Sequence, residues 1–165
     1  MKDSHTGLFN HRYLMDMLEI EFARAQRYGY PLSVFMLDID SFKSINDRYG
    51  HLFADRVLKQ FSNWLVPTMR RCDVVTRFGG DEFVILLPRA NLSQTRSAVD
   101  RLLRYTKRHH SRSAAKKVKI RFSGAIVSYP ERQVSNGVAL IKLADQLLAK
   151  AKGYGGGKVY PLLSS

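Results

Sequence analysis

The chain has 165 residues, with 27 Lys and Arg against 14 Asp and Glu, and a formal net charge of +13 at pH 7. This length is enough for one domain with a substantial core but short for two. The single cysteine, Cys72, excludes a disulfide framework, and the sequence shows neither a long apolar run nor a signal-peptide pattern. We therefore expect one cytoplasmic domain over residues 1–165, without a membrane span.

Apolar periodicity predicts the elements of the N-terminal half. Asn10 is a suitable N-cap for a helix that Gly29 ends. The nearly continuous apolar run 32–39 predicts a strand buried on both faces. A short helix over 42–49 and an amphipathic helix over 52–65 follow.

The C-terminal half alternates in the same way. Its predicted elements are a hairpin over 73–87, a helix from Ser93 as N-cap to about Arg108, a polar basic loop over 109–119, a strand over 120–128, a helix capped by Asn136 through Lys152, a flexible glycine turn over 153–157 and a short strand at 159–160. This order predicts an α+β fold with a mainly antiparallel sheet flanked by helices. It is closer to a ferredoxin-like arrangement than to a doubly wound sheet.

The hairpin carries the most unusual stretch, residues 77–83. Gly79 and Gly80 lie between two apolar runs and predict a tight turn, since glycine tolerates a positive φ. Asp81 and Glu82 follow at once. Carboxylates beside bare backbone suit a Mg²⁺–phosphate ligand. An ordinary charged hairpin is the alternative.

A further carboxylate, Asp38, lies at the end of the strand predicted over 32–39. If that strand and the hairpin are neighbours in one sheet, Asp38, Asp81 and Glu82 converge, and hard oxygen ligands of this kind favour Mg²⁺. We expect Asp40 on the opposite face from Asp38 if the strand continues that far.

Four polar residues around this cluster suit a nucleotide. Lys43 and Lys152 would supply positive charge for a polyphosphate, and the amide of Asn46 with the carboxylate of Asp55 would match the edge of guanine. Taken singly, each has another explanation: Asn46 as a turn former, Asp55 as an acid at a helix start and the lysines as surface charge.

The positive charge is concentrated between Arg96 and Arg121, where ten Lys and Arg accompany one acid, Asp100. Such a run can bind nucleic acid or an anionic membrane surface, or it can simply be solvated. Because Tyr105 is its one aromatic residue, no stacking platform for single strands is present and we expect no nucleic-acid partner.

Taken together, these motifs resemble the GGDEF family, the diguanylate cyclases. The resemblance extends from Asp3 to Val159 and includes, in order, Asp3 to Asn10 as the opening segment, Asp38 to Asp47 with Gly50-His51 as the central motif, Gly79-Gly80-Asp81-Glu82-Phe83 as the signature, and Ser123-Gly124 and Ala151-Lys152 as later landmarks. It implies a palm-like nucleotidyl-cyclase fold. It also implies an activity: two GTP molecules, one on each protomer of a homodimer, are condensed to cyclic di-GMP with release of two pyrophosphates.

The resemblance also implies roles for individual residues. Asp38, Asp81, Glu82 and the Ile39 carbonyl would bind Mg²⁺, with Mn²⁺ as an alternative, and Asp81 and Glu82 would serve catalysis. The substrate-binding set would be Phe42, Lys43, Asn46, His51, Asp55, Gly79, Gly80 and Lys152. Arg70 and Asp73 match an R-x-x-D motif that would bind cyclic di-GMP as an inhibitor, since arginine recognises phosphates and guanine edges bidentately.

The sequence departs from the family pattern at several positions. Ala54, His5 and Ala149 replace a usual glycine, leucine and tyrosine, and Gly156-Gly157 replace a usual Arg-Asn pair. Loss of that arginine removes a charge-assisted phosphate contact of roughly 1.5–3 kcal/mol. We hypothesise that Lys158 partly substitutes, which the GTP KM of a Lys158→Ala variant would test.

Two other functions stay open at this point. One is a catalytically weak or inactive module that acts as a receptor for GTP or cyclic di-GMP. The other is a basic nucleic-acid-binding domain, which salt-dependent binding to random DNA would indicate. Members of the family usually carry an upstream sensor that dimerises them, so we expect such a domain in the full-length protein.

Overall fold

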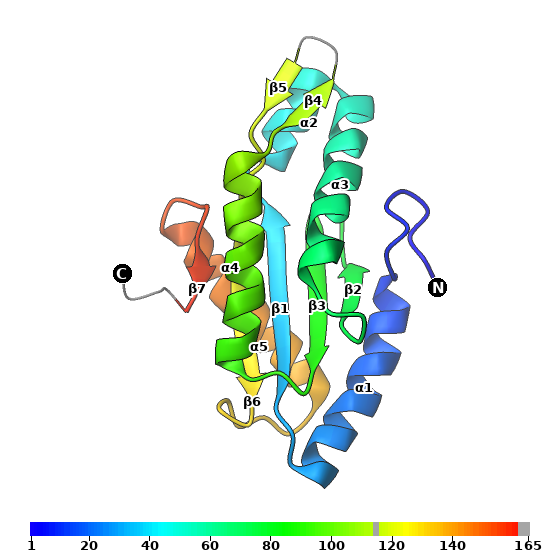
Figure 1. Ribbon diagram of the computed structural model, residues 1–165, viewed down its shortest axis with the longest axis vertical. Coiled ribbons are helices and arrows are strands. Elements are labelled where there is room, and N and C mark those ends of the chain that lie inside the picture. Colours follow the sequence, from blue (N-terminus) through cyan, green and yellow to red (C-terminus); the bar gives the residue numbers. More distant parts are fainter. Residues whose placement is uncertain (114–115, 162–165) are drawn as a thin grey trace.

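A five-stranded sheet forms the middle layer of the molecule, with strand order β2-β3-β1-β6-β7 (Figure 1). The computed structural model describes residues 1–113 and 116–161. The strands are β1 (Leu32–Ile39), β2 (Val74–Arg77), β3 (Glu82–Pro88), β6 (Phe122–Tyr129) and β7 (Val159–Tyr160). All neighbouring pairs are antiparallel except β6 and β7, which confirms the predicted α+β class.

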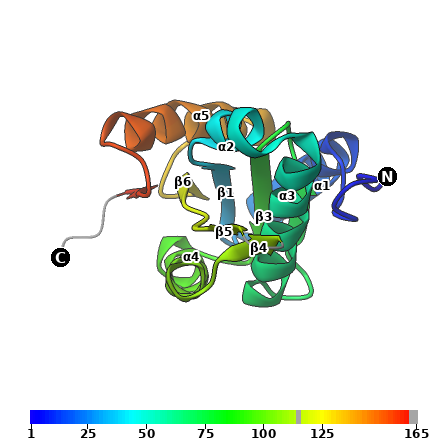
Figure 2. The same ribbon diagram turned by 90° about the horizontal axis from the view of Figure 1, so that it is seen from above.

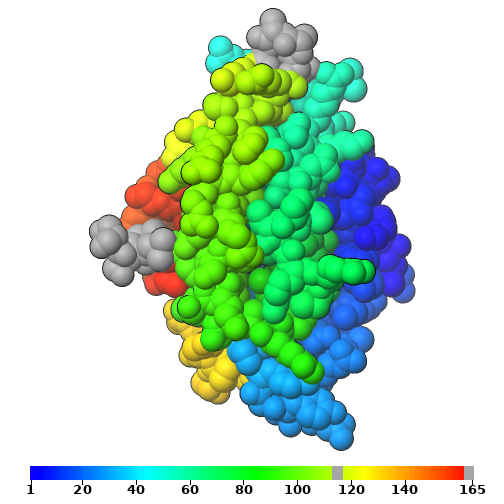
Figure 3. Space-filling view, viewed as in Figure 1, coloured from blue at the N-terminus to red at the C-terminus, as the bar shows by residue number. Residues whose placement is uncertain are grey.

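Helices cover both faces of this sheet, as the view from above shows (Figure 2). The helices are α1 (His11–Tyr28), α2 (Phe42–Tyr49), α3 (His51–Leu65), α4 (Leu92–Arg108) and α5 (Gly137–Gly153), with a short 3₁₀ helix, η1 (Val66–Thr68). Helices α1 and α5 pack on one face, and α3 and α4 pack on the other. In the space-filling view, α3 and α4 lie side by side over the sheet (Figure 3).

Strand β1 lies at the centre of the sheet, and this position accounts for its apolar sequence. Every residue of β1 is buried. Phe35 and Leu37 pack into the core beneath α3 and α4, whereas Val34 and Met36 pack into the core beneath α1 and α5. Burial of one such side chain stabilises the fold by about 1.5–3 kcal/mol, so a central strand needs apolar residues at successive positions.

The helix ends follow local chemistry, with one correction. Asn10 caps α1 by accepting from the Tyr13 N–H at 3.1 Å, as predicted. The prediction of Ser93 as the N-cap of the third long helix is wrong, because Asn91 caps α4. Asn91 and Gln94 form a reciprocal capping box, with hydrogen bonds of 2.9 and 3.0 Å, that satisfies two backbone N–H groups at once.

The segment predicted as a loop over 109–119 also differs. It contains two short antiparallel strands, β4 (Ser111–Ser113) and β5 (Lys116–Val118), which extend beyond the C-terminal end of α4. Residues 114–115 lie outside the described part. These strands are made mostly of polar residues, so no apolar alternation marks them in the sequence.

Candidate active site

A pocket of about 390 Å³ opens where β1 ends. Its lining includes six of the residues predicted to bind substrate or metal: Asp38, Ile39, Phe42, Lys43, Asp81 and Lys152. They come from β1, from the start of α2, from the turn before β3 and from the end of α5. Segments far apart in the sequence therefore meet at one end of the sheet.

Asp38 is a buried carboxylate in the lining of this pocket. Its side chain is 3% exposed, and one carboxylate oxygen, Oδ2, forms an ion pair with the ammonium group of Lys152, whose side chain is 48% exposed. The other oxygen, Oδ1, is buried and has no hydrogen-bond partner among residues 1–113 and 116–161. A buried carboxylate oxygen normally has a partner, so Oδ1 is available to a ligand.

The signature turn is held by its own backbone and by Arg77. The N–H groups of Phe78 and Gly79 donate to the Glu82 carbonyl at 2.8 and 3.2 Å, which closes the hairpin. Arg77 donates to the Gly80 carbonyl at 2.9 Å and pairs with Asp3 at 3.3 Å. The opening segment of the chain thus supports the turn, a role for Arg77 that sequence reasoning missed.

The physical reason for glycine at the turn differs from the predicted one. Neither Gly79 nor Gly80 has a positive φ. A Cβ at Gly79 would lie 2.8 Å from Oε2 of Glu82. The Glu82 side chain therefore lies close to the backbone of Gly79, and a larger residue there would move its carboxylate.

The two carboxylates of the signature have raised pKa values. Burial raises the pKa of Asp81, although Arg77 opposes the effect. Burial also raises the pKa of Glu82, and the negative charges of Asp81 and Asp145 raise it further. Perturbed acids of this kind gather at functional sites.

The predicted convergence of carboxylates is formed only in part. Glu82 is the register partner of Asp38 across β1 and β3, and Asp38 and Asp81 line the same pocket, but Glu82 is not among its lining residues. Within the described ranges, no three carboxylate, imidazole or thiol groups gather closely enough to form a metal site by themselves.

The expectation that Asp40 points to the opposite face from Asp38 is wrong, because Asp40 lines the same pocket. Side chains two residues apart along a strand lie on the same face, so alternation places both carboxylates on one side. Its Oδ1 accepts from the Ser123 hydroxyl at 2.6 Å, and its Oδ2 accepts from the Gly157 N–H at 2.6 Å. Asp40 therefore anchors the glycine turn after α5 to the end of β1. The sequence offered only its place beside Asp38 as a signal.

The remaining predicted substrate residues lie outside this lining. Asn46 is on α2, and His51 and Asp55 are exposed on the first turns of α3. The Asn46 side-chain oxygen, Oδ1, is buried and lacks a hydrogen-bond partner within the described part of the chain. Gly79 and Gly80 also lie outside the lining.

The glycine turn after α5 is the segment in which Gly156 replaces the arginine that is usual in the family. Gly155 and Gly156 line the pocket, and Gly156 has a φ of 72°, next to the Asp40 carboxylate. Lys158, the hypothesised substitute, does not line the pocket, and its ammonium group lies 5.8 Å from the centre of the Tyr154 ring. The structure therefore gives the Lys158 hypothesis no support.

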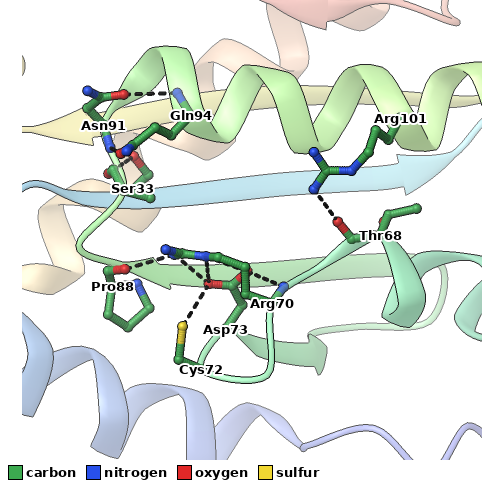
Figure 4. A network of polar contacts seen from close by, with 10 residues as sticks. Ser33, Thr68, Arg70, Cys72, Asp73, Pro88, Asn91, Gln94 and Arg101 are labelled. Carbon is green, nitrogen blue, oxygen red and sulfur yellow. Dashed lines mark hydrogen bonds and ion pairs between the residues drawn. The ribbon is translucent and has the colours of Figure 1, made fainter.

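The R-x-x-D segment forms a second site at the other end of the β2–β3 hairpin. Arg70 donates to Asp73 Oδ1 at 2.7 Å and to the Pro88 carbonyl at 2.8 Å (Figure 4). The Asp73 side chain is 1% exposed and that of Arg70 is 44% exposed. Asp73 thus holds Arg70 in place, and the guanidinium of Arg70 is the group open to a ligand.

This segment borders a pocket of about 280 Å³ between the hairpin and α4. Arg70 and Asp73 line it together with Arg101, which reaches from α4 and donates to the Thr68 carbonyl at 2.8 Å. Figure 4 shows Arg101 on the α4 side of the segment. Sequence reasoning missed Arg101, because only the fold brings α4 beside the R-x-x-D turn.

Comparisons with known proteins agree with this geometry. The family "Diguanylate cyclase, GGDEF domain" matches residues 1–158. The chain is 38% identical over 155 residues to the diguanylate cyclase DgcP of Pseudomonas aeruginosa, covering 94% of this chain and 23% of that protein. It is 34% identical over 165 residues to the diguanylate cyclase DosC of Escherichia coli, covering 95% of this chain and 34% of that protein. The chain thus spans about a quarter to a third of the length of these relatives.

Solved structures show the same fold. The GGDEF domain of YfiN from Pseudomonas aeruginosa superposes with a TM-score of 0.91 at 30% identity, covering 96% of this chain and 92% of that one. The GGDEF domain of DgcB from Caulobacter crescentus, in complex with c-di-GMP, gives 0.89 at 25% identity, covering 96% and 90%. No helix in the described part of this chain is long and apolar enough to cross a membrane. With the family match over nearly all of its length and this fold, the chain belongs to the GGDEF family of diguanylate cyclase domains.

Proposed function

We propose that this domain condenses two molecules of GTP into cyclic di-GMP and releases two pyrophosphates. The observation that carries the proposal is the pocket at the end of β1, where the carboxylates of Asp38 and Asp81 are joined by Lys43 and Lys152. Cationic side chains suit a triphosphate, and carboxylates suit the divalent cation that accompanies it.

The acidic residues fit Mg²⁺, with Mn²⁺ as an alternative. The unpartnered, buried Oδ1 of Asp38 is a hard oxygen ligand of the kind that Mg²⁺ prefers. Asp38, Asp81, Glu82 and the carbonyl of Ile39 would hold the ion. When bound, it neutralises phosphate charge and makes the attacking hydroxyl more acidic.

The rest of the site would orient the nucleotide. Lys43 and Lys152 contact the phosphates, with Phe42 beside them. Gly79 and Gly80 let the phosphates approach the signature turn, where Gly80 has open space around it. The unsatisfied amide oxygen of Asn46 reads a donor of guanine. Asp55 reads the guanine edge from α3, and His51 borders the same region.

The reaction needs two such sites. One pocket holds one GTP, so two protomers must face each other, with the 3′-hydroxyl of each nucleotide in line with the α-phosphate of the other. The raised pKa of Glu82 makes its carboxylate a stronger proton acceptor than an exposed glutamate. We therefore assign Glu82 to catalysis as well as to metal binding.

The second site would bind the product and inhibit the enzyme. Arg70 and Arg101 both line the pocket beside α4, and two arginines match the phosphates and guanine edges of cyclic di-GMP. Asp73 acts by positioning Arg70.

Chromatography of the reaction products tests this proposal. The purified domain is incubated with GTP and Mg²⁺ over a range of protein concentrations. Cyclic di-GMP should form, and its rate should rise faster than linearly with protein if two protomers must meet. Glu82→Gln should abolish it, whereas Glu131→Gln, at an exposed turn after β6, should not. Absence of product at every concentration would contradict the cyclase function.

One observation favours the alternative, a receptor for GTP or cyclic di-GMP. Gly156 lines the substrate pocket where the family usually has an arginine, so a phosphate contact is missing there. A domain that makes no product but binds cyclic di-GMP through Arg70 would support the receptor.

A further inference from the structure

A third pocket, of about 170 Å³, borders the same glycine turn as the substrate pocket: Gly157 lines it, whereas Gly155 and Gly156 line the substrate pocket. Lys107 from the last turn of α4, and Lys119 and Arg121 from the segment before β6, are among its lining residues. Phe122 contributes apolar surface. Neither the R-x-x-D site nor the proposed substrate site uses these three cations.

No ion pair among the described residues compensates the positive charge of this pocket. The side chains of Lys107, Lys119 and Arg121 form no hydrogen bond or ion pair with any described residue. The sequence contains no Asp or Glu between residues 101 and 130. Desolvation and the nearby charges of Lys117 and Lys119 lower the pKa of His110, which agrees with a strongly positive local potential.

The position of Arg121 depends on Gly157. A Cβ at Gly157 would meet the guanidinium group of Arg121, so the absence of a side chain lets that group lie against the turn. Gly157 lines the cationic pocket, and its N–H is bound to Asp40, which lines the substrate pocket. The two pockets thus share one turn.

The size and charge of the pocket define its ligand. Its volume equals that of about five to six waters and is below the roughly 300–1,000 Å³ of pockets that hold drug-sized molecules. It is also smaller than the pockets of about 390 and 280 Å³ assigned above to nucleotides, so a small inorganic anion fits it better than a nucleotide does. Three exposed cations around one pocket favour a multiply charged oxyanion, because charge-assisted hydrogen bonds to ionised groups are stronger than those between neutral groups.

We propose that the pocket of Lys107, Lys119 and Arg121 binds an inorganic phosphate anion, either pyrophosphate or phosphate. Pyrophosphate is the ligand that the reaction would supply, and this part of the assignment rests on the proposed function. The pocket would then hold released pyrophosphate next to the substrate pocket in which it forms, since both pockets border the same glycine turn.

Isothermal titration of the metal-free domain with sodium pyrophosphate, at fixed ionic strength, tests the proposal. Arg121→Gln should weaken binding about tenfold or more, the effect of losing one charge-assisted contact. Lys158→Gln is the matched control, because this lysine follows the same turn but lines neither pocket, and it should leave the affinity unchanged. Gly157→Asn should act like Arg121→Gln, because asparagine tolerates a positive φ while its side chain displaces the guanidinium.

Lys152→Gln separates this site from the substrate pocket. Pyrophosphate binding that survives Lys152→Gln but not Arg121→Gln supports the proposal. Binding lost in Lys152→Gln and kept in Arg121→Gln would place the anion in the substrate pocket and overturn it. If sulfate competes as well as pyrophosphate, the binding reflects charge attraction alone and the proposed phosphate site is refuted. If pyrophosphate does not bind at all, the proposal is refuted as well.

A parallel titration with phosphate identifies the source of the anion. Tighter binding of pyrophosphate assigns the reaction product, and equal or tighter binding of phosphate assigns the free ion. Both results support the pocket. Synthesis of cyclic di-GMP by the wild type is measured separately, so failure of the cyclase function and failure of the anion site are distinguishable.

Discussion

The ion pair of Asp38 and Lys152 leads to an asymmetric prediction about stability. Asp38 is buried and Lys152 is half exposed. Lys152→Met leaves a buried carboxylate without its partner, whereas Asp38→Asn removes the buried charge and leaves the lysine free to reach water. We therefore expect Lys152→Met to destabilise the fold and Asp38→Asn to change it little.

The magnitude follows from the exposure of the pair. Breaking a fully buried ion pair costs about 3–5 kcal/mol. Solvent screening at the half-exposed lysine reduces this, and we expect about 1–2 kcal/mol for Lys152→Met. For a chain of this size that lowers Tm by about 2–8 °C. The double variant should recover most of this loss, because it leaves no buried charge.

Thermal unfolding with and without Mg²⁺ measures these effects. In Lys152→Met, Mg²⁺ at about ten times its Kd should restore about 1.4 kcal/mol by binding the native state, and Asp38→Asn should respond less. Lys142→Met, at an exposed position on α5, is the matched control and should stay within about 0.5 kcal/mol of wild type. Equal destabilisation by Lys152→Met and Asp38→Asn would refute the reasoning.

Three further predictions concern the signature, the second site and the core. Burial raises the pKa of Glu82, so the folded state binds more protons than the unfolded state, and stability falls as the pH rises above the ordinary pKa of a glutamate. Glu82→Gln should therefore raise Tm at about pH 7 but not at about pH 4. An equal gain at both pH values would contradict this. Arg70→Ala and Arg101→Ala should each weaken cyclic di-GMP binding roughly ten- to a hundredfold in calorimetry. Only Arg70→Ala should also lower Tm, since it leaves the buried Asp73 without its guanidinium partner. Gly124→Ala places a Cβ 2.6 Å from the Phe35 ring and should cost about 1–3 kcal/mol in urea unfolding, whereas Gly153→Ala, with open space around it, should not.

Local patterns in the sequence predicted much of the fold. The apolar run of β1, the N-cap at Asn10 and the helix end at Gly29 were assigned correctly, because each depends on chemistry within a few residues. The same local reasoning placed Asp38 at a strand end and Asp81 at a turn. It failed at the start of α4, where Asn91 and not Ser93 is the N-cap, because Asn91 forms a reciprocal capping box with Gln94. It also failed at the polar strands β4 and β5.

Only the tertiary structure decided which of these residues meet. The pairing of β1 with β3 brings Asp38 and Asp81 to one pocket, and α5 adds Lys152 from more than a hundred residues further along the chain. Likewise, packing of α4 puts Arg101 beside Arg70, and Gly157 admits the guanidinium of Arg121. Such contacts depend on strand register and helix packing across the whole domain, so no local pattern contains them. The sequence alone determined most of the elements and the chemical groups that they carry, and the fold determined the sites that those groups form.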